Sequence, residues 1–195
     1  MLAANDVTGV VLAGGKSKRM GEDKSFLSYG DKFFIDQLLD VLKDTAVSEI
    51  LISINEVDKY HSLPFRRIKD TFVDHGPLAG IYEALTVSQN DHILCVPCDM
   101  PLIDSAVLQY ILSESTPDII NVTVVGQNLH PLLGVFPKVI LPNLEDYLKS
   151  DRKKVFDFIT GVEYKLIELS AFRNKIININ TEDEYRSLIN TFADE

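Results

Sequence analysis

Apolar and polar positions follow two alternating rhythms along the first two thirds of the chain. Short, mostly apolar runs predict buried strands over residues 7–13, 49–54, 66–69 and 92–96. Between or after these runs, apolar residues recur at three- and four-residue steps, which predicts helices over residues 33–43, 78–87 and 105–112. This alternation is typical of parallel strands joined by crossover helices.

The pattern changes after Pro117. Two β segments, 118–125 and 129–136, are expected to join around Gly126-Gln127-Asn128. The rest of the chain predicts helices over 138–148, 153–159 and 182–192 and a strand over 164–169. The sequence therefore predicts a single domain over residues 1–195, a three-layer α/β/α sandwich with a mostly parallel mixed sheet. Ligands of such folds bind beyond the carboxyl ends of the strands.

Composition narrows the class of protein. The 195 residues are 46% hydrophobic and 25% charged, which is typical of a globular domain with a sizeable core. No apolar stretch reaches the ~18–20 residues of a membrane span, and the first residues do not form a signal-peptide pattern, so we expect a cytoplasmic protein. The net charge of −10 argues against nucleic acid or an anionic membrane as a partner.

A glycine- and lysine-rich segment follows the first predicted strand at residues 12–24. Paired glycines let backbone N–H groups approach an anion, and basic side chains neutralise phosphate charge; the bases here are Lys16, Lys18, Arg19 and Lys24. The spacing of Gly14, Gly15 and Gly21 fits neither the dinucleotide-binding fingerprint nor the P-loop. A solvated basic turn is the alternative, but it does not explain two adjacent glycines directly after a buried strand.

Polar residues also follow the next three predicted strands, as Asn55, Asp70 and Asp99. Because the carboxyl ends of parallel strands meet at one edge of a sheet, we expect these residues to share a crevice with the glycine-rich segment. A local basic segment in an acidic protein suggests one small anionic ligand. Mg²⁺ prefers one or two carboxylates together with phosphate oxygens and waters, so Asp99 is the candidate metal ligand.

The backbone around Asp99 is restricted by two prolines in the sequence Pro97-Cys98-Asp99-Met100-Pro101. The structural alternative is that Asp99 or Asp104 caps the helix that follows. Asp104 lies directly before that helix, which leaves Asp99 available for a ligand.

Gly80 lies one turn inside a predicted helix that begins at Pro77. A glycine there costs about 1 kcal/mol relative to alanine, so we expect something to approach the backbone closely. A ligand and a packing contact with another helix or with the sheet are equally compatible with this pattern.

Cys95 and Cys98 have the C-x-x-C spacing of some zinc and redox sites. They are the only cysteines, and the four histidines show no ligand spacing around them. A redox pair normally opens a helix, whereas Cys95 lies in an apolar run, so we interpret Cys95 as a small buried hydrophobic residue.

Taken together, these motifs resemble the molybdenum cofactor guanylyltransferase family, whose elements recur in order between residues 8 and 182. The resemblance is carried by Leu12-Ala13-Gly14-Gly15, Arg19-Met20-Gly21, Asp23-Lys24, Gly76-Pro77-Leu78-Ala79-Gly80 and Pro97-Cys98-Asp99-Met100-Pro101. It implies a Rossmann-like nucleotidyltransferase fold, with a nucleotide-binding part over about 1–115 and a pterin-substrate part over about 116–195. Related cytidylyltransferases typically carry Leu-Ala-Ala-Gly in the first motif, so Gly14 favours guanine.

The same resemblance implies roles for individual residues. Lys24, Arg19 and Asp99 would be catalytic, with Asp99 as the Mg²⁺ ligand. The nucleotide site would comprise Leu12, Ala13, Gly14, Gly15, Lys24, Asn55, Asp70, Gly80 and Asp99. Where the family often shows Asn-x-Asn in the second strand, this chain has Ser53-Ile54-Asn55, which leaves the role of Ser53 open.

For the second substrate the resemblance implies contacts from His130, Arg152, Asn178 and Asn180. Thr181 and Glu184 form a capping-box pattern that accounts for the threonine without a ligand. A strand over these residues would project Asn178 and Asn180 to the same face. Arg152 and the two lysines after it suggest an anion site, or equally a solvated basic start of a helix.

The reaction that the resemblance implies transfers GMP from GTP to the terminal phosphate of molybdenum-molybdopterin and releases pyrophosphate. Apoproteins of molybdoenzymes, or other proteins of cofactor biosynthesis, are further partners that it suggests. Two alternatives remain: a molybdopterin cytidylyltransferase or another nucleotidyltransferase on the same scaffold, and a non-catalytic carrier of molybdopterin or GTP.

Overall fold

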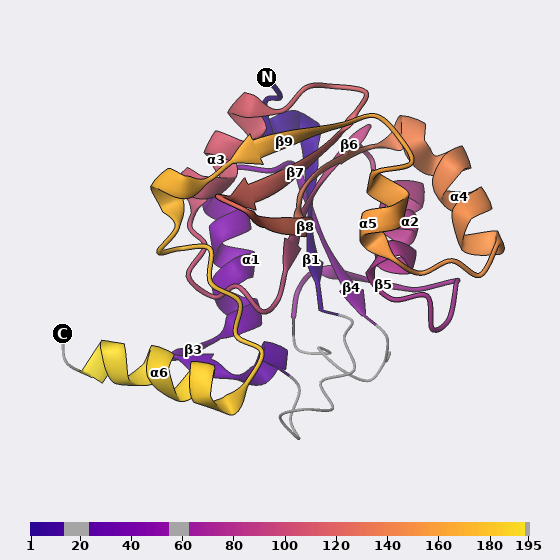
Figure 1. The fold of residues 1–195 in the computed structure, drawn as a ribbon. Coiled ribbons are helices and arrows are strands. Elements are labelled where there is room, and N and C mark those ends of the chain that lie inside the picture. Colours follow the sequence, from indigo (N-terminus) through magenta and orange to yellow (C-terminus); the bar gives the residue numbers. More distant parts are fainter. Residues whose placement is uncertain (14–23, 55–62, 194–195) are drawn as a thin grey trace.

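A computed structural model of the chain describes residues 1–13, 24–54 and 63–193, and its centre is one seven-stranded sheet (Figure 1). Its strands are β1 (Val7–Leu12), β4 (Glu49–Ile54), β5 (Arg66–Lys69), β6 (His92–Pro97), β7 (Ile120–Val125), β8 (Asn128–Pro137) and β9 (Tyr164–Glu168). Their order across the sheet is β5-β4-β1-β6-β8-β7-β9. β8 pairs antiparallel with β6 and β7, while the other pairs are parallel, which confirms the expected mostly parallel mixed sheet.

Helices cover both faces of this sheet, as the alternating pattern predicts (Figure 1). Their bounds are α1 (Phe34–Asp44), α2 (Pro77–Val87), α3 (Ser105–Glu114), α4 (Leu141–Lys149), α5 (Val155–Ile159) and α6 (Glu182–Ala193). Short 3₁₀ turns lie at Ala4–Asp6 (η1), Lys24–Phe26 (η2), Lys138–Ile140 (η3) and Ser170–Phe172 (η4). No helix in the part of the chain described here has the length and apolarity needed to cross a membrane.

Successive residues of the central strand β1 point to opposite faces and so divide the core in two. Val7 and Val11 pack with side chains of α1 and α3 on one face. Val10 and Leu12 pack with α2, α4 and α5 on the other. Because both faces are covered, every residue of β1 is buried, which explains the continuous apolar run in the sequence.

A third, smaller cluster lies at the end of the molecule where α6 packs. It joins α6 to α1 and to a short hairpin of β2 (Ser28–Tyr29) and β3 (Lys32–Phe33). The buried members are Leu27, Phe34, Ile179 and Leu188. The C-terminal helix is thereby attached to the segment that immediately follows the glycine-rich sequence.

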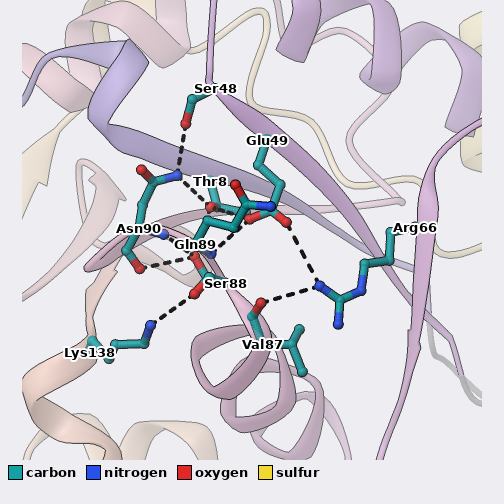
Figure 2. Close-up of polar contacts among 9 residues, drawn as sticks. All are labelled: Thr8, Ser48, Glu49, Arg66, Val87, Ser88, Gln89, Asn90 and Lys138. Carbon is teal, nitrogen blue, oxygen red and sulfur yellow. Dashed lines mark hydrogen bonds and ion pairs between the residues drawn. The ribbon is translucent and has the colours of Figure 1, made fainter.

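A buried polar network ties together the amino-terminal ends of the strands (Figure 2). Thr8 of β1 is fully buried and donates to Glu49 Oε2 of β4 at 2.9 Å, while its Oγ1 lies 2.7 Å from Ser88 Oγ. Asn90 Nδ2 donates to Thr8 Oγ1 at 2.8 Å, and the Lys138 ammonium donates to the Ser88 carbonyl at 2.9 Å. The network joins β1, β4, the α2–β6 connection and η3, which directly follows β8.

We expect Thr8→Val, which keeps the shape of the side chain, to lower the free energy of unfolding by about 1–3 kcal/mol. The substitution removes the hydroxyl that Glu49, Ser88 and Asn90 share, so each of these side chains loses one hydrogen bond at a buried position. Urea denaturation measures the change. Thr86→Val is the matched control, because the Thr86 hydroxyl is exposed on α2 and donates to the Tyr82 carbonyl of the same helix. Equal effects of the two substitutions would contradict the prediction.

Candidate active site

The carboxyl ends of β4, β1 and β6 lie side by side and are joined by backbone hydrogen bonds beyond the strands. The Ala13 N–H donates to the Ser53 carbonyl at 3.0 Å, and the Cys98 N–H donates to the Leu12 carbonyl at 3.2 Å. The side chains of Leu12 and Ala13 are buried in the core. The chain is therefore fixed in place at the residue where the glycine-rich segment begins.

Part of the expected site lies outside the described residues. Gly14, Gly15, Arg19 and Asn55 fall in this part, so their assignments stay predictions. Lys24 is the first residue of η2, and its side chain is likewise outside the described part.

Asp99 leaves the end of β6 and meets the C-terminal part of the chain. Asn178 Nδ2 donates to Asp99 Oδ1 at 3.1 Å, and the Ile179 N–H donates to the Asp99 carbonyl oxygen at 2.8 Å. These bonds join residues that lie far apart in the sequence and that the resemblance assigns to different substrates. The expected metal ligand and one expected pterin contact are thus neighbours.

His130 completes this group because β8 runs against its neighbours. The antiparallel direction brings the first residues of β8 to the edge where β6 ends. Burial lowers the pKa of His130 below its ordinary value of 6.5, opposed by a hydrogen bond with Asn178 and by the negative charge of Asp99. The imidazole is therefore neutral near pH 7, and Asn178 links it to the carboxylate.

Asp104, the alternative to Asp99, has a structural role. Its Oδ1 accepts a hydrogen bond from the Val107 N–H at 3.1 Å and caps α3, and its Oδ2 pairs with Lys175. The prediction that Asp104 serves the helix is confirmed. Asp99 makes no such cap.

Asp70, which follows β5, packs against the start of α2. Its Oδ1 lies 3.5 Å from the hydroxyl of Ser53, which is buried at the end of β4. A Cβ atom at Gly80 would lie 2.3 Å from Ser53 Oγ and 3.5 Å from Asp70 Oδ1. The close approach expected at Gly80 is therefore a helix–sheet contact, and it accounts for the glycine; a nucleotide contact there stays a prediction.

The surroundings of Asp70 disfavour its negative charge. Burial and the nearby negative charge of Glu83 raise the pKa of Asp70 to about 6, and the Ser53 hydroxyl opposes them only partly. The side chain is thus ionised at neutral pH in surroundings that favour its protonated form. Such a group is typical of a site whose charge serves a ligand.

The remaining predicted residues lie apart from these groups or serve other contacts. The guanidinium of Arg152, in the connection between α4 and α5, lies 4.4 Å from the ring centroid of Tyr147. Residues 176–180 do not form a strand, and the Asn180 N–H donates to Glu184 Oε2 at 2.6 Å. Thr181 and Glu184 exchange the two hydrogen bonds of a capping box, as predicted.

The cysteine interpretation is confirmed. Cys95 is fully buried in β6, and the two cysteines do not form a disulfide. Burial alone raises the pKa of the Cys95 thiol well above its ordinary range, so the sulfur is neither a nucleophile nor a thiolate ligand at neutral pH.

Comparison with known proteins decides the family. Residues 9–163 match the model of the MobA-like NTP transferase domain. The probable molybdenum cofactor guanylyltransferase of Flavobacterium johnsoniae is 33% identical over 184 residues, which cover 93% of this chain and 96% of that protein. This chain belongs to the MobA-like NTP transferase family.

Solved structures share the fold of this MobA-like transferase. The molybdopterin-guanine dinucleotide biosynthesis protein A of Archaeoglobus fulgidus superposes with a TM-score of 0.80 at 18% identity, covering 96% of this chain and all of that one. A Mycobacterium tuberculosis protein, described as a complex with manganese, superposes with a TM-score of 0.64 at 19% identity, covering 96% and 99% of the two chains. The predicted nucleotidyltransferase fold is confirmed.

Two features of this MobA-like transferase were not found from its sequence. The first is the effect of Glu83 on Asp70. Glu83 lies on α2, three residues after Gly80; its negative charge raises the pKa of Asp70, and its carboxylate accepts a hydrogen bond from the Thr71 hydroxyl at 2.6 Å. The helical spacing from Gly80 was the available signal. The second feature, the contact of Asn178 with Asp99, spans 79 positions and has no local signal.

We expect Asp70→Asn to raise the free energy of unfolding by about 1–2 kcal/mol at pH 7, after allowance for solvent screening. The folded state holds the Asp70 proton more tightly than the unfolded state, so the contribution of Asp70 to stability is lost as pH rises from about 4 through 6. Urea denaturation at several pH values should show the stability advantage of the variant over the native protein growing across this range.

Asp40→Asn is the control of opposite sign for that experiment. Hydrogen bonds with Lys32 and Lys43 lower the pKa of the exposed Asp40 carboxyl. Its removal should slightly destabilise the protein at pH 7. A gain of stability in both variants would point to a general charge effect and contradict the interpretation of Asp70.

Gly80→Ala should destabilise the protein by about 1–3 kcal/mol, because its new methyl group overlaps the Ser53 hydroxyl. Adding Ser53→Ala should recover part of that loss, since the overlapping oxygen is then absent. A double-mutant cycle in urea measures the coupling. Strictly additive effects would show that the two residues do not compete for this space.

Proposed function

We propose that this nucleotidyltransferase is a molybdenum cofactor guanylyltransferase, which transfers GMP from GTP to the terminal phosphate of molybdenum-molybdopterin and releases pyrophosphate. One observation supports this most directly. The Asp99 carboxylate lies at the strand-end edge with Asn178 and His130, at the point where the nucleotide half and the C-terminal half of the chain meet. The relative from F. johnsoniae carries the same function in its name.

The proposed transfer depends more on stabilising negative charge on the phosphates than on a general base. A phosphate monoester has a second pKa near 6, so the attacking oxygen is already anionic at neutral pH. This agrees with a neutral His130. In this proposal, Lys24 and Arg19 stabilise the transferring phosphoryl group and the departing pyrophosphate.

A divalent cation fits the donor set that Asp99 offers. Within the described residues, no group of three or more His, Cys, Asp or Glu side chains is arranged to hold a metal. A metal at Asp99 would therefore be shared with phosphate oxygens, as Mg²⁺ prefers. Asn178 engages one carboxylate oxygen and leaves the other for the ion, whose charge would neutralise the triphosphate.

The two substrates are assigned to two parts of the single domain. We place GTP against residues up to about 115, including Asp70 and the glycine-rich segment, and the pterin against residues from about 116 onward. His130, Asn178 and Asn180 carry the pterin side of this proposal. Arg152, which stacks on Tyr147, is assigned to the phosphate of the pterin.

The test is pyrophosphate release by the purified protein with Mg²⁺ and molybdenum-loaded molybdopterin, with GTP and CTP in parallel reactions. Release with GTP alone is expected. Release with CTP alone would instead make the protein a cytidylyltransferase, and tight GTP binding without pyrophosphate would favour a carrier.

In the same assay, Asp99→Ala should lower the rate by at least about 10²–10³-fold, because it removes the charge that orients the metal and phosphates. Asp104→Asn is the matched control: it lies five positions along the chain, and its remaining amide oxygen can still cap α3. Comparable rates in native protein and Asp99→Ala would remove Asp99 from the mechanism.

A further inference from the structure

The C-terminal residues 176–193 lie beyond the part of the chain that matches the family model, yet they contact the candidate metal ligand. The family model ends at residue 163. Two hydrogen bonds nevertheless reach Asp99 from this segment, one from the Asn178 side chain and one from the Ile179 backbone. We call residues 176–193 the C-terminal clamp.

The first contact orients the carboxylate. A carboxylate at the exit of a strand can rotate, and an amide that engages one of its oxygens selects which oxygen is presented to a ligand. An asparagine amide has one donating and one accepting end, so donation to Asp99 leaves the carbonyl oxygen of Asn178 to accept from His130. Asn178 is therefore held from both sides.

The second contact, from the Ile179 N–H, fixes the main chain beside Asp99. The side chain of the same residue anchors the clamp elsewhere. The Ile179 side chain is buried against Leu27, Phe34 and Leu188. Tyr185 of α6 donates through its hydroxyl to the Ser28 carbonyl at 2.9 Å and packs edge-on against Phe34, with 6.0 Å between the ring centroids.

These anchors lie directly after the turn that begins with Lys24. η2 spans Lys24–Phe26, and Leu27 and Ser28 follow it. Figure 1 shows α6 beside β3, at the end of the molecule toward which β1 runs. One segment thus contacts the candidate metal ligand at one point and, at another, the residues directly after η2, the turn that begins with the candidate phosphate-binding lysine.

We infer that Asn178 and Ile179 are positioning residues that orient the Asp99 carboxylate and set its distance from η2, so that metal-dependent nucleotide binding requires the C-terminal clamp. The inference rests on the proposed function, because it takes Asp99 as the ligand of a metal shared with GTP. It gives Asn178 a role that does not require contact with the pterin. Loss of a residue that orients a metal ligand typically costs 10–100-fold in metal affinity.

The test measures how strongly Mn²⁺ tightens GTP binding, without any turnover. GTP is titrated calorimetrically into the full-length protein with and without saturating Mn²⁺, and the ratio of the two affinities is the coupling factor. Asn178→Ala should lower this factor by about tenfold or more, leave GTP affinity without metal unchanged, and keep the native Tm. Asn178→Gln, which retains the amide, should recover part of the factor.

One control variant and one replacement variant complete the experiment. Asn143→Ala removes an exposed asparagine from α4 and should leave the coupling factor at its native value. Asn178→Leu, of similar volume to asparagine, replaces Asn178→Ala if that variant does not fold.

The outcomes separate the two proposals. A native coupling factor in folded Asn178→Ala or Asn178→Leu would overturn the clamp inference and leave the guanylyltransferase proposal standing. A native protein that does not bind GTP would overturn the proposed function, and the clamp inference with it. If GTP binds but Mn²⁺ has no effect on its affinity, Asp99 is not a shared metal ligand and the clamp inference is wrong.

Discussion

The parallel pairing of β4, β1 and β6 is the constraint on which the rest of the structure depends. It brings the ends of three strands to one edge, where the Ala13 and Cys98 N–H groups extend the ladder past the last strand residues. A single antiparallel strand, β8, then carries His130 to the same edge from the other direction. Without this alignment, residues drawn from the whole length of the chain would not meet.

The two carboxylates at this edge are held in different ways, and the difference fits two roles. Asp70 is pressed between Ser53 and α2, where burial and Glu83 oppose its charge. Asp99 receives a hydrogen bond from Asn178, and its backbone is tied to Ile179. The charge of Asp70, which its surroundings disfavour, would be stabilised by a cation or a hydrogen-bond donor of a ligand. The Asp99 carboxylate, which an amide orients, suits a metal ion that binds in a fixed direction.

The local sequence pattern predicted the strands, helices and helix caps, but not the contacts between residues that are distant in the sequence. Apolar periodicity predicted the strands of the central sheet, and capping chemistry predicted the roles of Pro77, Asp104 and Thr181, because these depend on residues within one turn. Gly80 was recognised as costly in a helix, but its contact Ser53 lies on β4, far away in the sequence, and could not be identified from the local pattern. Asn178 was assigned from resemblance alone, since its contact with Asp99 depends on how the C-terminal segment folds back.

The two ends of β1 differ: its start lies in a stabilising hydrogen-bond network, and its end lies at the candidate active site. At its start, the buried Thr8 hydroxyl lies in a partly buried network of hydrogen bonds that joins several elements. At its end, the neighbouring groups include an ionised Asp70 that folding disfavours, and the approach to α2 passes through Gly76 at a φ of 65°. Sites that must bind charged ligands commonly carry such unfavourable groups, and the fold must offset them elsewhere. The parallel strands β4, β1 and β6, which end at the site, begin in or beside this network, so the two regions belong to the same part of the sheet.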